Sequence, residues 1–168
     1  AKGAGWGANP SSEDGVDIVA SVPILLHGVT YGGPSGSARL EIKSADGSEV
    51  LYQDQRQLAF GKSVDSWCDV LLPKPVELAA GKKYHVAAFG TCSGSVNYGE
   101  LGNASVGLEG GGTLTFSGAD QKNGTGQGRG QLCHMVYSLP PMGAPPAEDP
   151  SDPFGELDAM LDDSLNDS

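Results

Sequence analysis

Short runs in which apolar and polar residues alternate, each closed by a glycine-containing turn, constrain the fold of this chain more than any other feature. In residues 38–54, Leu40 and Ile42 alternate with charged side chains, and Asp46-Gly47 precedes a second apolar run. A two-residue period is typical of a strand with one face against a core, and Asp-Gly is a strong hairpin-turn signal. The segment is therefore predicted to be an antiparallel hairpin.

The same pattern recurs along the first 140 residues. Two runs within residues 16–33 are separated near Pro23, and a run at 66–72 is expected to end at Pro73-Lys74-Pro75. Further strands are predicted at 82–90, in a hairpin over 104–118, and at 131–139. Roughly nine or ten short strands, with frequent turns and no helical pattern, indicate an antiparallel sandwich or barrel. We predict an all-β antiparallel domain over residues 1–140.

The composition changes after Leu139. Residues 141–168 hold eight acidic residues and no Lys or Arg, and they begin with a Pro-rich linker. Asp152 suits a helix N-cap and Pro153 the first helical position, so a short amphipathic helix is predicted over 153–165. Its apolar stripe comprises Phe154, Leu157, Met160, Leu161 and Leu165. Because a helix of roughly 13 residues is marginal alone in water, this stripe is expected to dock on the domain or on a partner.

The net charge of −11 is concentrated in that tail. The body holds the remaining 13 acidic residues and all 10 Lys and Arg residues, so it is close to neutral. Neither part has the basic surface that nucleic-acid binding needs, and no apolar run approaches the roughly 18 residues of a membrane helix. No basic-then-apolar leader is present. We therefore expect a cytoplasmic chain whose sequons at Asn103, Asn123 and Asn166 are not glycosylated.

No motif for catalysis, metal binding or nucleotide binding is complete. The glycines between positions 124 and 130 lack the dinucleotide-binding spacing and precede a strand rather than a helix. Glu13 and Asp14 are expected to be solvated in a turn-like stretch. The histidines and cysteines lack metal-ligand spacing; they are His27, His85, His134, Cys68, Cys92 and Cys133. We predict no enzyme, no metal and no cofactor, with ordinary strand histidines and reduced cysteines.

Several short motifs follow one another across residues 5–140 in the order and at the spacing of a known module. They are "GWG" at 5–7, "VDIVASVPILLHGVTYGG" at 16–33, "ARLEIKSADGSEVL" at 38–51, "VLLPKPVELAAGKKYHVAA" at 70–88, "SVNYGELG" at 95–102 and "GGTLTFSGADQKNGTGQGRGQLCHMVYSLP" at 111–140. Together they resemble the PHR domain, the β-sandwich of the Pam/Highwire ubiquitin ligases and of BTB-containing adaptors for cullin ligases. The resemblance implies that residues 1–140 form an antiparallel two-sheet β-sandwich. Two features depart from that family: Cys133 stands where it usually has Pro, and "TCSGSV" replaces a Gly-Pro opening.

The resemblance implies a protein-interaction module rather than an enzyme, because in the family the sandwich presents loops to protein partners while other domains or subunits carry out ubiquitination. The candidate partner-binding residues are Tyr31, Gly32, Gly33, Asn97, Tyr98, Gly99, Asn123, Gly124, Thr125 and Gln131. Turn formation is the alternative role of Gly and Asn at these positions.

Two other functions stay open. The chain could be a structural subunit that its acidic C-terminal helix anchors in a large assembly. It could also be a carbohydrate-binding sandwich that stacks sugar rings on exposed aromatic side chains, for which the candidates are Trp6, Tyr31, Trp67 and Tyr98.

Overall fold

The computed structural model of the chain describes residues 2–6, 13–32, 36–54, 58–59, 63–64, 67–92, 96–100, 103–118, 129–130 and 132–141. Within these residues all the regular structure is strand, and every strand pair is antiparallel. The all-β antiparallel class predicted from the sequence is therefore confirmed for the described part of the chain. The predicted C-terminal helix lies outside it.

The larger sheet has seven strands. Its order is β11-β12-β2-β9-β4-β5, and β6 also pairs with β4. The strands are β2 (Asp14–Ala20), β4 (Gly36–Ser44), β5 (Val50–Gln53), β6 (Leu58–Ala59), β9 (Lys83–Cys92), β11 (Ser105–Gly107) and β12 (Thr113–Gly118).

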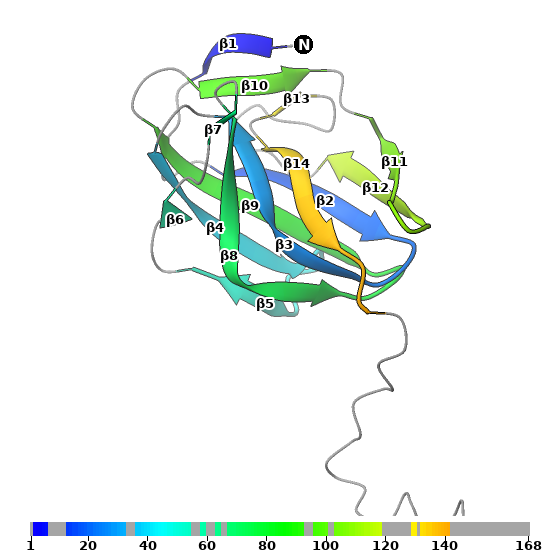
Figure 1. Ribbon diagram of the computed structural model, residues 1–168. Coiled ribbons are helices and arrows are strands. Elements are labelled where there is room, and N and C mark those ends of the chain that lie inside the picture. The colour runs from blue at the N-terminus through cyan, green and yellow to red at the C-terminus, as the bar shows by residue number, and fades with distance from the viewer. Residues whose placement is uncertain are drawn as a thin grey trace, which may run out of the picture.

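A four-stranded sheet in the order β14-β3-β8-β7 lies against the larger one, and a small three-stranded sheet, β1-β10-β13, lies at one end of both (Figure 1). The strands of the four-stranded sheet are β3 (Ile24–Gly32), β7 (Ser63–Val64), β8 (Trp67–Leu78) and β14 (Leu132–Ser138). Those of the small sheet are β1 (Lys2–Trp6), β10 (Val96–Glu100) and β13 (Arg129–Gly130).

The core lies between the two larger sheets and follows from the alternation along the strands. In β4, for example, Leu40 and Ile42 are buried while Arg39, Glu41 and Lys43 are only partly so. Side chains from both sheets join in one cluster: Ile18, Leu40, Ile42, Val86 and Leu114 from one side, and Ile24, Leu26, Val29, Tyr31 and Val70 from the other. Each fully buried apolar side chain of this kind contributes about 1.5–3 kcal/mol to stability.

The β4–β5 hairpin forms where the Asp-Gly signal predicts it. Gly47 has φ 73°, a left-handed conformation that glycine adopts without a steric penalty, and its N–H donates to Ser44 O over 2.8 Å. Asp46 accepts hydrogen bonds from the Ser44 hydroxyl at 2.6 Å and from the Ser48 N–H at 3.0 Å. The hydrogen bond from Ser44, followed by those from Ser48, lowers the pKa of Asp46 to about 2.

The predicted end of a strand at Pro73-Lys74-Pro75 is wrong, because β8 continues to Leu78. Proline cannot donate to a ladder, so it is tolerated only at sheet edges and bulges. Here Leu26 is paired with Val76 and Gly28 with Leu71, so residues 72–75 form an irregularity opposite one β3 residue. Among the described strands, β7 alone pairs with the other side of β8, at Trp67 and Cys68, so within the described residues this stretch is an edge.

The number of strands is also larger than predicted, fourteen in the described residues. The additional strands include β6, β7 and β13, which have two residues each and are too short to show a period.

Asp14, expected to be solvated, is instead the buried first residue of β2, and the neighbouring Glu13 carboxylate binds a histidine described below.

Candidate functional site

The candidate site is the end of the sandwich at which β3 and β9 finish and β4, β8 and β14 begin, here called the loop end. Strand register defines it, because Gly32 at the end of β3 pairs with Trp67 at the start of β8. In the larger sheet, Gly36 at the start of β4 pairs with Cys92 at the end of β9. The small sheet of β1, β10 and β13 lies across this end (Figure 1).

Three segments that the sequence suggested as partner-binding regions meet at the loop end. Tyr31 of β3 is paired with Leu132 of β14, and Gly99 of β10 is paired with Gly130 of β13. Gly130 and Leu132 are the chain neighbours of Gln131, and β10 lies in contact with both β3 and β14. Segments about 30 and 65 residues apart in the chain are thus neighbours in the fold.

The structure places Tyr31 in the core rather than on a loop. The side chain is 1% exposed, and its ring lies over Gly90 of β9 in the opposite sheet. A Cβ atom at position 90 would lie only 2.5 Å from Tyr31 Cζ, so the glycine provides the space that the ring fills. Tyr31 therefore ties the two sheets together at the loop end and does not present its side chain to a partner or to a sugar.

The remaining predicted residues are described in part or not at all. Gly32 is the buried last residue of β3, and positions 97–99 lie in β10, where the backbone alone is described. Trp67, an aromatic candidate for sugar stacking, is half-buried at the start of β8. Other predicted residues lie outside the described part of the chain: Gly33, Asn123, Gly124, Thr125, Gln131 and the tail residues Phe154, Leu157, Met160, Leu161 and Leu165.

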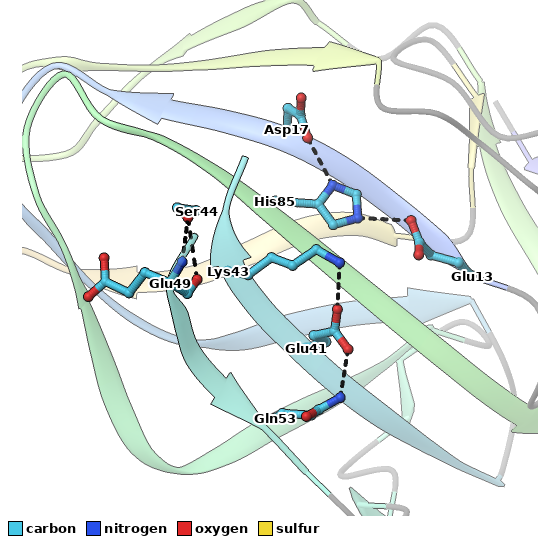
Figure 2. A network of polar contacts seen from close by, with 8 residues as sticks. All are labelled: Glu13, Asp17, Glu41, Lys43, Ser44, Glu49, Gln53 and His85. Atoms are coloured by element: carbon cyan, nitrogen blue, oxygen red, sulfur yellow. Dashed lines mark hydrogen bonds and ion pairs between the residues drawn. The ribbon is translucent and has the colours of Figure 1, made fainter. Parts of the chain in front are cut away.

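A second polar arrangement lies on the outer face of the larger sheet, where His85 of β9 is held between two carboxylates (Figure 2). Its Nδ1 is 2.8 Å from Asp17 Oδ1 and its Nε2 is 2.8 Å from Glu13 Oε1. The imidazole is 8% exposed and both carboxylates are 17% exposed. The ring also covers Gly15, where an added Cβ would lie 2.9 Å from His85 Cε1.

This arrangement acts as a clamp between strands. Ionised carboxylates only accept hydrogen bonds, and one carboxylate faces each ring nitrogen of His85. Both ring nitrogens are therefore engaged in contacts within the sheet. The clamp binds Glu13, the residue just before β2, to His85 of β9. Strand β9 lies between β2 and β4 near the centre of the larger sheet.

Lys43 and Glu41 of β4 make further polar contacts on this face of the sheet, between His85 and Gln53 of β5 (Figure 2). Lys43 Nζ donates to Glu41 Oε1 over 2.7 Å, and Gln53 Nε2 donates to Glu41 Oε2 over 2.9 Å. Burial alone would raise the pKa of Glu41, but the hydrogen bonds from Lys43 and Gln53 and the charge of Lys43 together lower it. The hydrogen bond to Glu41 is the largest cause of a raised pKa at Lys43.

The histidines and cysteines that can be described do not form a metal site. His27 bonds to the Ser138 hydroxyl over 2.8 Å, His134 is exposed, and Cys68 is buried in β8. In the described residues, no group of three His, Cys, Asp or Glu side chains is arranged to hold a metal ion. A helix suited to crossing a bilayer is likewise absent from this part of the chain.

Sequence reasoning missed the histidine clamp. It depends on the register in which Asp17 lies opposite His85, and a single sequence does not reveal that register. One indication in the sequence was that Asp17 alternates with the apolar residues of its strand, which places it on the outward face of the sheet. Glu13 gave no signal, since it precedes the alternating run.

Comparison with known proteins points to one family. A model of the PHR domain matches residues 1–138. The E3 ubiquitin-protein ligase highwire of Drosophila melanogaster is 29% identical over 147 residues, which cover 82% of this chain. The chain spans 3% of the length of that protein.

Proposed function

The chain belongs to the PHR domain family, and from that membership we propose that it is a non-catalytic protein-interaction module that binds a protein partner through its loop end. The observation that supports this most is the convergence of β3, β10 and β14 at one end of a rigid sandwich. Binding residues are commonly carried by loops that a rigid scaffold positions.

The architecture of the loop end suits recognition of a protein rather than chemistry. Tyr31 packs over Gly90 beneath it and joins the two sheets next to the paired ends of β3, β8 and β14. A pre-organised binding surface loses little conformational entropy when a partner binds.

A ubiquitin-ligase context is part of this proposal. The similar protein is named as an E3 ubiquitin-protein ligase, and the matched region is a small part of it. In this proposal the module selects or positions a partner protein, and other domains or subunits carry out catalysis. The cytoplasmic location expected from the sequence is consistent with that role.

Co-purification of partners with charge-altering variants tests the binding surface. Lys is introduced at Asn97 or at Gln131, both in segments of the loop end, and the matched control is Glu77→Lys. Glu77 is exposed on β8 and is paired with Leu25, at the opposite end of β3. The proposal predicts that Asn97→Lys and Gln131→Lys reduce recovery of the specific partner while Glu77→Lys leaves it unchanged. Equal recovery with all three variants would contradict it.

The tail offers a second and separable prediction. The apolar stripe from Phe154 to Leu165 is proposed to contribute an anchor to a larger assembly, as the sequence indicates. Deletion of residues 150–168 should then weaken recovery of an assembly without changing the thermal stability of the sandwich. Undiminished recovery would remove the anchor from the account and leave the loop-end proposal intact.

A further inference from the structure

Strand β1 is an edge of the small sheet and belongs to neither larger one. It lies on the outer side of β10, and among the described strands its ladder with β10 is the pairing that holds it (Figure 1). That ladder is short and irregular. Its paired positions are Lys2 with Gly99, Gly3 with Tyr98 and Trp6 with Val96, and the register shifts between Gly3 and Trp6. In the larger sheet, by contrast, β4 pairs with β9 without interruption from Gly36 to Ser44.

The sequence of β1 also favours its detachment. Gly3 and Gly5 are two of its five residues. Glycine loses more conformational entropy on ordering than other residues and weakens the interior of a strand. Ala4 and Gly5 together lie opposite the one residue Asn97, so the ladder is interrupted in its middle. A short, interrupted edge strand belongs to the low-stability end of a fold, which opens locally while the core stays folded.

Strand β10, in contrast, is held by the rest of the domain. It contacts β3 and β14 of the four-stranded sheet, and it pairs with β13 at Gly99 and Glu100. Departure of β1 would therefore leave β10 in place and expose the backbone groups that β1 pairs with, between Val96 and Gly99. An uncovered strand edge presents N–H and C=O groups that another strand can use.

The candidate partner-binding residues 97–99 lie on this strand, and its neighbours already pair with much of their backbone. Tyr98 and Gly99 are paired with β1, and Gly99 is also paired with β13. A partner that binds this backbone must therefore take the place of one of the two strands. The β1 position is shown to accept an extended segment of five residues, whereas β13 has two.

We propose that β1 is a displaceable strand, and that an extended segment of the partner protein takes its place on β10. This inference rests on the proposed loop-end function and says how the partner is held there, by main-chain pairing along β10. The segment expected is similar to β1 itself, which is short, contains small residues and ends in an aromatic residue. While β1 is seated, the affinity for the partner is reduced in proportion to the fraction of molecules in which β10 is uncovered.

Two variants of the full chain move β1 in opposite directions. Gly3→Pro/Ala4→Pro weakens its ladder, because successive N–H groups of a strand point to opposite sides and one of the two prolines therefore removes a donor to β10. Trp6→Cys/Val96→Cys places two cysteines at directly paired positions, so that a disulfide fixes β1 on β10. The same variant under reducing conditions is the matched control, and oxidised wild type controls for the native cysteines.

The probe is a synthetic peptide with the sequence of residues 1–7, titrated against the chain of residues 1–168 while amide chemical shifts are recorded. We expect the proline variant to bind it saturably, with shifts concentrated at 96–100. The oxidised cysteine variant should show no such shifts until it is reduced. A peptide that carries the same two prolines should not bind.

Recovery of the partner separates displacement of β1 from loop-end binding in general. The oxidised cysteine variant should recover at least about tenfold less partner than its reduced form, because the disulfide keeps β10 covered. The displacement proposal is overturned if the proline variant shows no peptide-induced shifts at 96–100, or if the oxidised variant shows the same shifts as the reduced one. If the oxidised and reduced forms recover the partner equally while Asn97→Lys does not, loop-end binding stands and displacement of β1 is wrong.

Discussion

Replacement of Gly90 by Ala tests the contact that joins the two sheets beneath the loop end. The new Cβ would lie 2.5 Å from Cζ and 2.7 Å from Cε1 of Tyr31, and closer still to the hydroxyl. Carbon atoms pack best at roughly 3.5–4.0 Å, so about 1 Å of movement is needed. Neither partner moves easily, because Gly90 is paired with Ala38 of β4 in one sheet, and Tyr31 is paired with both Leu132 and Cys68 in the other.

The expected cost follows from that constraint. Overpacking a core costs about 1–3 kcal/mol, and the strands that flank Tyr31 on both sides place this substitution in the upper half of the range. With a urea dependence of about 2 kcal/mol per M, the unfolding midpoint should fall by about 1 M. The matched control is Gly107→Ala in β11, where an added Cβ meets nothing within 4 Å, and its midpoint should stay near that of the wild type.

A compensating change identifies Tyr31 as the cause. The hydroxyl is the nearest Tyr31 atom to the new Cβ, so Tyr31→Phe should recover part of the loss in the Gly90→Ala background. A double-mutant cycle measured by urea unfolding should give a coupling of about 0.5–3 kcal/mol. The reasoning is refuted if Gly90→Ala unfolds within about 0.2 M of the control, or if the two substitutions are additive.

Three further predictions concern polar groups. Burial, and next the hydrogen bond to Asp54, raises the pKa of Tyr52 from 10.0 to about 12. The contribution of the Tyr52 hydroxyl to folding stability is therefore complete below pH 10 and is lost as the pH rises through 12. In urea unfolding across that window, the wild type should lose stability relative to Tyr52→Phe. The pKa of Asp46 is lowered from 3.8 to about 2, so the contribution of its carboxylate to folding stability is present above pH 3.8 and is lost as the pH falls toward 2. In a plot of unfolding free energy against pH, Asp46→Asn should therefore reduce the loss of stability at acid pH. His85→Ala leaves two partly buried carboxylates without their partner and should cost about 1–3 kcal/mol in urea unfolding, whereas the exposed His134→Ala should stay within about 0.5 kcal/mol of the wild type.

Local patterns in the sequence predicted the strands with a clear period. The β4–β5 hairpin is the clearest case, because alternation and an Asp-Gly turn both act within a few residues. Pro73 and Pro75 misled the prediction, since they signal a strand end unless the ladder bulges there, and only the pairing with β3 reveals the bulge.

The site was harder to predict because it depends on contacts between distant residues. The resemblance drew attention to Tyr31 and to the segment at 97–99, and the structure places β3 and β10, which carry them, in contact. It did not reveal that Tyr31 is buried, since a Tyr followed by glycines looks like a loop until Gly90 is found beneath its ring. The His85 clamp depends in the same way on strand register.

Site-specific photo-cross-linking in cells tests the central claim most directly. A photoreactive amino acid is placed at position 97, in β10 at the loop end, and in a matched chain at the exposed position 77, at the far end of β3 and β8. If the loop end is the partner-binding surface, position 97 should yield a discrete cross-linked protein and position 77 should not. Cross-links from position 77 with none from position 97 would contradict the account.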